Sequence, residues 1–387
     1  MNPNLLEKAE ILIVRIWLWL LNFILAIIRK ILFPWKIKNP KNILIYKLGN
    51  IGDIVCAMPA MYTVKENFPD ARITLLTSPG KRGAIGAKDF LDGASYLDNI
   101  RVYYSDDIST FSKIFSMISI LKKEKYDLFI QLPDDWVKFK TLIRNQIFAK
   151  IIGVKSALGF YIRTSQMFKK TQVDFTSKKT ESVALLDILV ENGIKKYEIK
   201  FEFPKHIFES YKNNAEIDLL KKENDIILGI CMGGGTEDKK WPIEKFIEVF
   251  RDLKLKYTKM GVIFFGGLSE IDSIEKVAKT CELRYINFAG KSIKESILAI
   301  KSTDAFLTND TGPMHIAAAF GIPIIALFST RSVFGSWFPY GKNNFCLYKK
   351  FLKCDYLKED CVKKSIVTIS VEEVIGACNE VFYQIIS

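Results

Sequence analysis

Residues 47–55, K-L-G-N-I-G-D-I-V, form the first segment whose residue types could carry chemistry. Gly49 and Gly52 allow the backbone to turn tightly and to approach a ligand closely, with Asn50 between them. Asp53 lies where a helix is predicted to begin, and a helix start offers free N–H groups and a positive dipole end. Its carboxylate is therefore either a helix cap or a general base that takes a proton from a substrate.

A second segment, G-G-G-T-E-D-K-K-W-P at residues 233–242, combines glycines with hydroxyl and ammonium groups. Backbone N–H groups, the Thr236 hydroxyl and the Lys239 ammonium group are suitable partners for phosphate oxygens. The plainer alternative is a flexible basic loop. Glu270, which follows a two-glycine turn, is either an ordinary helix residue or a carboxylate that accepts hydrogen bonds from a ribose.

The third segment is T-N-D-T-G-P-M-H at residues 308–315. Asp310 or Thr311 can cap the helix that is predicted to follow. The free N–H groups of Thr311 and Gly312 can face a diphosphate. A lone histidine is more often structural, but His315 falls on the first turn of this helix, beside the same anion site. The second and third segments together predict a site for a phosphorylated ligand.

Short apolar strands alternate with helices around these segments, which predicts an α/β fold with parallel sheets covered on both faces. Two such runs indicate two Rossmann-like domains that face a cleft, with ligands bound beyond the carboxyl ends of the strands. The predicted strands are 42–46, 72–77, 127–132, 225–231, 261–265, 284–288, 304–308 and 323–328. The predicted helices are 54–67, 109–124, 182–192, 243–257, 270–280, 293–301 and 311–320.

The chain of 387 residues is long enough for two domains. The predicted organisation is an apolar helix, a first domain, a polar linker, a second domain and a C-terminal helix. These parts cover residues 1–40, 41–205, 206–224, 225–368 and 369–387.

The N-terminal segment Ile11–Trp35 is strongly apolar, but its longest run without a charge extends only from Ile16 to Ile28, whereas a membrane-spanning helix needs about 20 residues. A helix that lies in the membrane interface, a spanning anchor and a packing helix are all compatible with this pattern. No small-residue cleavage site follows, so a signal peptide is not expected. A polar residue recurs every seven positions along one narrow stripe: Lys8, Arg15, Asn22, Arg29 and Lys36.

The net charge of +13 favours polyanionic partners. Nucleic acid is not predicted, because no basic stripe interleaved with aromatic residues appears outside the apolar N-terminus. Seven cysteines, an odd number, indicate a reducing compartment. Cys346, Cys354 and Cys361 lack the spacing of a metal site, and the chain has only two histidines, so no metal is expected.

Three stretches in this order, Lys47–Ala60, Lys239–Pro242 and Asn309–Ala319, resemble glycosyltransferase family 9, the ADP-heptose:lipopolysaccharide heptosyltransferases. The resemblance covers roughly residues 41–387 and leaves out the apolar N-terminus. It implies the GT-B type of fold, with the acceptor on the first domain and the nucleotide-sugar on the second.

The resemblance also implies roles for the residues that match the family's motifs. Asp53 would be the general base. The acceptor-side loop would contain Gly49, Asn50 and Gly52. The donor would be bound by Thr236, Lys239, Glu270, Asp310, Thr311, Gly312 and His315, with Glu270 at the nucleoside.

The predicted function is inverting transfer of a sugar, a heptose from ADP-heptose, onto a lipopolysaccharide core or another membrane-associated glycan. No cofactor is required in this scheme, because basic groups and helix N-termini neutralise the leaving diphosphate. The expected location is cytoplasmic, on the inner face of the cytoplasmic membrane, with residues 5–36 at the membrane surface. A nucleotide-sugar epimerase of GT-B fold and an inactive nucleotide-sugar-binding protein are the alternatives.

Overall fold

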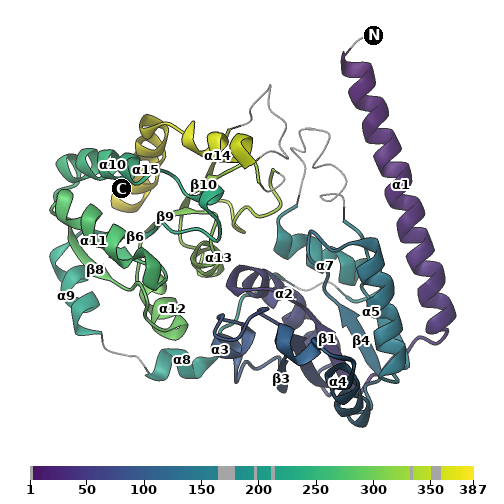
Figure 1. The fold of residues 1–387 in the computed structure, drawn as a ribbon. Coiled ribbons are helices and arrows are strands. Elements are labelled where there is room, and N and C mark those ends of the chain that lie inside the picture. The colour runs from purple at the N-terminus through teal and green to yellow at the C-terminus, as the bar shows by residue number, and fades with distance from the viewer. Residues whose placement is uncertain (1–2, 164–178, 196–197, 211–213, 332–333, 350–358) are drawn as a thin grey trace. The chain divides into compact units, whose positions relative to one another are not determined.

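A computed structural model describes the chain except for residues 1–2, 164–178, 196–197, 211–213, 332–333 and 350–358 (Figure 1). The chain divides into two compact units, Met1–Lys205 and His206–Ser387. Each unit is built on a parallel β-sheet with helices between the strands. The predicted α/β class with two Rossmann-like domains is therefore confirmed.

The first unit contains a five-stranded sheet in the order β3-β2-β1-β4-β5, with every neighbouring pair parallel. The interior residues of β1 have no exposed surface, which explains its uniformly apolar sequence. The strands are β1 (Asn42–Tyr46), β2 (Arg72–Thr77), β3 (Asn99–Val102), β4 (Leu128–Gln131) and β5 (Ser156–Leu158).

Three helices of the first unit cover one face of this sheet. Leu25 of α1, Leu121 of α4 and Leu142 of α5 share one apolar cluster with Leu44 of β1. Figure 1 shows α1 alongside α5, and α2 packs against α7. The helices are α1 (Pro3–Leu32), α2 (Ile51–Asn67), α3 (Ala87–Leu91), α4 (Phe111–Lys123), α5 (Phe139–Ile151) and α7 (Glu181–Glu191), with a 3-10 turn η1 (Ser105–Ile108).

The segment 206–224, predicted as a linker, contains most of α8 (Lys205–Ser210) and all of α9 (Ala215–Glu223). Asn214 caps α9, because its side-chain oxygen accepts hydrogen bonds from the backbone N–H groups of Glu216 and Ile217. Helix α9 packs on the strands of the second unit.

The second unit contains a six-stranded parallel sheet in the order β11-β10-β9-β6-β7-β8. Its strands are β6 (Ile226–Cys231), β7 (Met260–Phe264), β8 (Arg284–Asn287), β9 (Ala305–Asn309), β10 (Ile324–Phe328) and β11 (Asn344–Tyr348). Its helices are α10 (Ile243–Lys256), α11 (Ile271–Thr280), α12 (Ile293–Lys301), α13 (Gly312–Ala319), α14 (Glu359–Val367) and α15 (Val371–Ile386), with 3-10 turns η2 (Glu237–Lys239) and η3 (Leu268–Glu270).

Candidate functional site

In the first unit, Asp53 lies on the first turn of α2, just beyond the carboxyl end of β1. Its Oδ2 accepts a hydrogen bond from the backbone N–H of Asn50 at 3.1 Å. Gly49 has a φ of +130°, and a Cβ at this position would stand 2.3 Å from the Cβ of Asp53. Glycine is thus required for the loop to pass so close to the carboxylate. Asp53 caps the helix and also remains at the ligand-binding edge of the sheet.

Behind Asp53, the first unit contains a buried cluster of ionic side chains. Lys47 has no exposed surface; its Nζ forms an ion pair with Asp134 and lies 4.0 Å from Oε1 of Glu181. The Arg163 guanidinium binds Glu181 through two contacts of 2.7 and 2.8 Å and lies 3.9 Å from Asp135. Because each charge has a partner of opposite sign, the cluster avoids the large cost of an isolated buried ion.

Of this cluster, only Lys47 belongs to a motif that was recognised in the sequence, and the other four members were missed. One signal was present: Asp134 and Asp135 follow the predicted strand 127–132, at the edge of the sheet where ligands bind. Arg163 and Glu181 carried no such signal, because nothing local connects them to residues 47–55.

The cluster sets the protonation of the groups around the proposed base. Burial opposes a charged Lys47, but the carboxylates of Asp134, Asp53 and Glu181 hold the pKa of its ammonium group above the ordinary value. Burial raises the pKa of Asp53 to about 6, against the opposing effect of Lys47. A carboxylate with this pKa is a stronger base than an exposed aspartate and is still ionised near neutral pH.

In the second unit, the predicted phosphate-binding groups meet at the carboxyl ends of the strands. Nζ of Lys239 lies 2.6 Å from Oδ2 of Asp310, which follows β9. The Asn309 side chain donates to the backbone oxygens of Met232 and Gly233 at 2.7 and 3.0 Å. These bonds hold the loop after β6 against the loop after β9.

Thr311 and Gly312 lie at the start of α13, as predicted from the sequence. Thr311 occupies the N-cap position, and its hydroxyl lies 3.0 Å from the hydroxyl of Thr308. Gly312 is the first residue of the helix, so its N–H group is among those without a partner inside the helix. His315 is buried, with its ring 6.0 Å from that of Trp337.

Thr236 belongs to a hydrogen-bond group that the sequence did not reveal. Its hydroxyl donates to Oδ1 of Asp238, and Nη1 of Arg331 binds Oδ2 of Asp238 at 2.7 Å. Although burial has the opposite effect, these two donors hold the pKa of Asp238 below its ordinary value. Asp238 is buried and ionised, and it holds the half-exposed Arg331 beside Thr236. Arg331 follows β10 and is a further cation at this edge of the sheet.

Glu270 also lies against the glycine loop, the stretch Gly233–Gly235 that follows β6. Its Oε2 accepts a hydrogen bond from the backbone N–H of Gly267 at 2.7 Å. Its other oxygen lies 3.9 Å from Nζ of Lys240, and a Cβ at Gly233 would stand 3.3 Å from its carboxyl carbon. Glu270 therefore borders the predicted phosphate loop, as a residue that contacts the nucleoside of the same ligand would.

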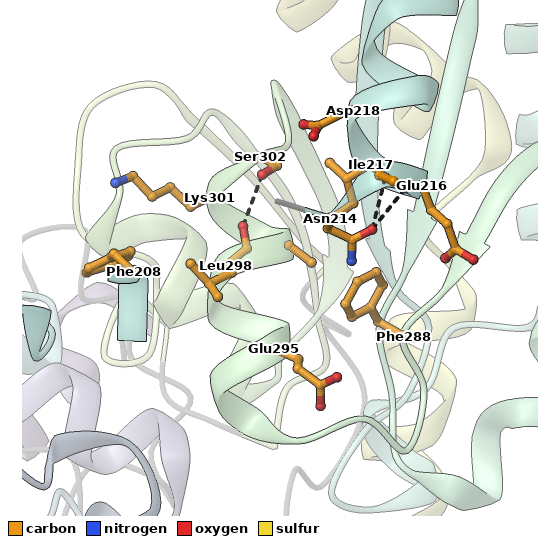
Figure 2. A pocket seen from close by; sticks show the side chains of 12 residues that line it. Phe208, Asn214, Glu216, Ile217, Asp218, Phe288, Glu295, Leu298, Lys301 and Ser302 are labelled. Carbon is orange, nitrogen blue, oxygen red and sulfur yellow. Dashed lines mark hydrogen bonds between the residues drawn. The ribbon is translucent and has the colours of Figure 1, made fainter. Parts of the chain in front are cut away.

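A hollow of about 530 Å³ in the second unit is separate from these residues (Figure 2). It is bordered by α9 and α12 and includes none of the predicted donor-binding residues. The charged residues in its lining are mostly acidic, because Glu216, Asp218 and Glu295 border it together with one cation, Lys301. This hollow is therefore a poorer candidate for binding phosphate than the glycine loop.

The cysteines offer no evidence for a metal centre. Across the residues that the structure describes, no three His, Cys, Asp or Glu side chains are grouped so that they could hold a metal ion. Cys346 lies in β11, where burial raises the pKa of its thiol to about 12. Cys354 lies outside the described residues, and nothing is described of the Cys361 side chain.

Comparison with known proteins identifies relatives that are glycosyltransferases. The sequence profile described as "Glycosyltransferase family 9 (heptosyltransferase)" matches residues 114–366. The chain is 24% identical to the lipopolysaccharide core heptosyltransferase OpsX of Haemophilus influenzae over 303 residues, which are 76% of this chain and 81% of OpsX.

Solved structures show a similar fold. A family 9 glycosyltransferase from Veillonella parvula superposes with a TM-score of 0.66 at 20% identity, covering 89% of this chain and 98% of that one. The Escherichia coli ADP-heptose lipopolysaccharide heptosyltransferase II superposes with a TM-score of 0.61 at 16% identity, covering 89% and 100%. These likenesses establish the GT-B type of fold.

Proposed function

Because the chain belongs to glycosyltransferase family 9, we propose that this glycosyltransferase moves a heptose from ADP-heptose onto a lipopolysaccharide core or a related membrane-held glycan, with inversion at the anomeric carbon. The observation that carries the proposal is the ion pair between Lys239, on the loop after β6 that also contains Thr236, and Asp310 at the carboxyl end of β9. An ammonium group and a helix N-terminus meet there, and both are suitable partners for the oxygens of a diphosphate.

The reaction divides between the two units. The carboxylate of Asp53 takes the proton of an acceptor hydroxyl, and the resulting oxygen nucleophile forms a bond to the anomeric carbon of the donor. The bond from that carbon to the diphosphate breaks, and its electron pair leaves with ADP. Lys239 and the N–H groups at the start of α13 stabilise the charge that develops on the departing phosphate. Thr236 contributes when its hydroxyl turns from Asp238 to a phosphate oxygen. Glu270 accepts hydrogen bonds from the ribose.

The donor site can be tested by ligand-dependent stability. An excess of ADP of about 100 times its Kd should stabilise the wild-type protein by about 2.7 kcal/mol. Lys239→Ala should weaken ADP binding by about 10- to 100-fold, because a hydrogen bond to a charged group contributes about 1.5–3 kcal/mol. Thermal shift and calorimetric titration with ADP, UDP, GDP and ADP-heptose measure both effects.

Lys259→Ala provides the matched control, because Lys259 is exposed in the same unit and lies 3.9 Å from an equally exposed Asp225. It should bind ADP as the wild type does. If no nucleotide stabilises the wild-type protein, the loop after β6 is not a donor site, and the proposed transfer from ADP-heptose is contradicted.

Arg331 should contribute to the same site as a third cation. Arg331→Ala is expected to raise the KM for the nucleotide-sugar by about tenfold, the effect of one charge-assisted hydrogen bond. Arg331→Lys should recover only part of the loss. A planar guanidinium group can bind Asp238 on one side and a phosphate on the other, whereas an ammonium group lacks this fixed set of donors. Steady-state kinetics measures this, with Arg284→Ala as the control, since Arg284 forms an exposed pair with Glu223. A wild-type KM in Arg331→Ala would exclude Arg331 from the donor site.

The location that we propose is the cytoplasmic face of the membrane, where a membrane-held acceptor would be reached through the N-terminal helix. Helix α1 contains a stretch, Leu12–Leu32, that is long and apolar enough to cross a membrane by length and composition. Most of that stretch is exposed on the surface of the unit. An exposed apolar helix beside an acceptor domain supports attachment to the membrane surface.

A further inference from the structure

Helix α1 is fixed to the first unit by hydrogen bonds as well as by apolar packing. The side chain of Asn22 donates to the backbone oxygen of Ile162 at 3.0 Å and accepts from the backbone N–H of the same residue at 2.8 Å. Leu18 and Leu25 are buried on either side of Asn22 along the helix. An asparagine that pairs with both backbone polar groups of one residue fixes the rotation of the helix about its axis.

The attachment continues to the end of the helix. Gln146 of α5 donates to the backbone oxygen of Leu25 at 3.1 Å, and Lys150 of α5 donates to that of Leu32 at 2.8 Å. Contacts therefore run from Leu18 to Phe33, a distance of about 20 Å along a helix. Helix α5 presents the exposed charges of Arg144 and Lys150. A unit with such a surface cannot enter the hydrocarbon, so α1 in this arrangement does not cross a bilayer.

In a helix that lies alone in the membrane interface, the polar residues face water. Part of the polar stripe of α1 faces the protein instead. Asn22 and Arg29, two residues of the stripe, are turned toward the protein, where Arg29 approaches the backbone oxygen of Ala157 at 3.5 Å. The opposite side of α1 faces outward and is apolar. Its exposed residues include Leu12, Ile13, Ile16, Trp17, Trp19, Phe23, Ile24, Ile27 and Ile31.

A second apolar patch lies on α4, on the same face of the sheet as α1 and α5. Phe111 is 83% exposed and Phe115 is 66% exposed, which is unusual for phenylalanine on a helix of a folded unit. Helix α4 follows β3 after a short connection, so its first turn lies toward the carboxyl ends of the strands. Asp53 lies at this same edge, and so does the contact between Asn22 and Ile162, which follows β5.

The charges around these two patches suit an anionic surface. From Ile11 to Lys41 the chain contains no acidic residue. Basic side chains occur on both elements: Arg15, Lys30, Lys36 and Lys38 on and after α1, and Lys113, Lys122 and Lys123 on α4. The acidic residues just before α4, Asp106 and Asp107, lie close to the cation Arg82. Apolar helix faces flanked by Lys and Arg bind the headgroup region of anionic bilayers, through burial of apolar area and through electrostatic attraction.

We propose that the outer faces of α1 and α4 together form a docking surface for an anionic lipid bilayer, with α1 lying in the plane of the membrane. This surface holds the edge of the sheet that contains Asp53 next to the headgroups. The inference deepens the proposed function, since a membrane-held acceptor gives the docking its purpose, but vesicle binding itself does not depend on sugar transfer.

Binding is tested by co-sedimentation of the full chain with vesicles of phosphatidylglycerol and phosphatidylethanolamine. The variants Trp17→Ser/Trp19→Ser and Phe111→Ser/Phe115→Ser should each lower vesicle affinity by about tenfold, because each removes large apolar side chains from the interface. All four side chains are exposed, so folding should be preserved. The control Leu255→Ser/Tyr383→Ser removes two equally exposed apolar residues from the second unit and should bind vesicles as the wild type does.

Orientation is tested by labelling Ala9→Cys and Lys38→Cys variants, bound to vesicles from outside, with a membrane-impermeant maleimide, and mapping the label by peptide mass spectrometry. Both positions should be labelled, because both ends of an in-plane helix stay on one side of the membrane. Protection of one position would show a spanning helix and overturn the proposal. So would wild-type affinity in the α4 variant, or a stable dimer without vesicle binding, which would assign the apolar face to a second copy of the chain.

Transfer assays separate failure of docking from failure of the proposed function. With a soluble acceptor fragment, the docking variants should keep wild-type rates, while with acceptor in vesicles their rates should fall about tenfold, in parallel with the loss of binding. Equal rates on both acceptors would overturn the docking proposal. Normal vesicle binding without transfer of any sugar would instead contradict the proposed function.

Discussion

Asp53→Asn is expected to lower kcat by about 10²- to 10⁴-fold, the contribution typical of a positioned general base. The asparagine side chain has nearly the same shape and can still accept the hydrogen bond from the Asn50 backbone, so the start of α2 should be preserved. It cannot take a proton from an acceptor hydroxyl. Donor affinity should not change, because the donor groups belong to the second unit. Pre-steady-state transfer assays and ADP titration together measure these two results.

The pH dependence of the transfer rate should report the ionisation of Asp53. With a pKa of about 6, raised by burial, Asp53 is protonated and inactive as a base below this value. The rate at low acceptor concentration should therefore rise with pH through about 6 and level off above it. In Asp53→Asn this limb should disappear. A limb that remains in the variant would assign the titration to another group.

Asp89→Asn is the matched control for Asp53→Asn. Asp89 occupies the equivalent position on α3, where its Oδ2 accepts a hydrogen bond from the backbone N–H of Gly86 at 2.7 Å. Loss of a capping carboxylate alone should therefore affect both variants alike, by about 1 kcal/mol of stability or less. If the two variants lose activity equally, Asp53 acts only as a cap, and the general base must be sought elsewhere.

Lys47→Met should destabilise the first unit by about 3 kcal/mol, because it removes the counter-ion of the partly exposed Asp134 and one of the two cations beside the buried Glu181. The lysine has no exposed surface, and it is placed between Asp134 and Glu181. Methionine fills much of the space, so lost charge rather than lost volume dominates the effect. Urea unfolding followed by tryptophan fluorescence and circular dichroism measures the change.

Two comparisons show whether this loss comes from the buried charge. Lys41→Met removes a lysine whose ion pair with Asp70 is exposed, and such pairs contribute about 0–1 kcal/mol. The double variant Lys47→Met/Asp134→Leu also removes the carboxylate that has lost its counter-ion, so it should recover part of the stability. An additive loss in the double variant would contradict the role of the ion pair. Since Lys47 lowers the pKa of Asp53, the acid limb of the rate in Lys47→Met should also move to higher pH.

Much of the fold follows from local patterns in the sequence. Strands β1 and β2 agree with their predicted bounds, because short apolar runs buried on both faces are distinct from anything around them. The elements that were missed have mixed patterns. Strand β5 has only three residues, β11 is half-buried, and α5 combines a basic outer face with polar side chains directed toward α1.

The sequence alone determined the strand-to-loop-to-helix segments that contain Asp53, Lys239 and Asp310. These assignments succeed because glycine turns and helix starts are local features, encoded within about ten consecutive residues. Their roles in catalysis remain predictions that the experiments above address.

Only the tertiary structure decided the surroundings of these segments. The buried ionic cluster joins Lys47 to Glu181 across more than a hundred residues, and Asp238 positions Arg331 in the same way. The outward side of α1 was likewise set by Asn22 and its distant partner Ile162. A periodic pattern shows that a helix has two faces, but which face is turned to the protein depends on the hydrogen bonds and packing that the other side of the interface supplies.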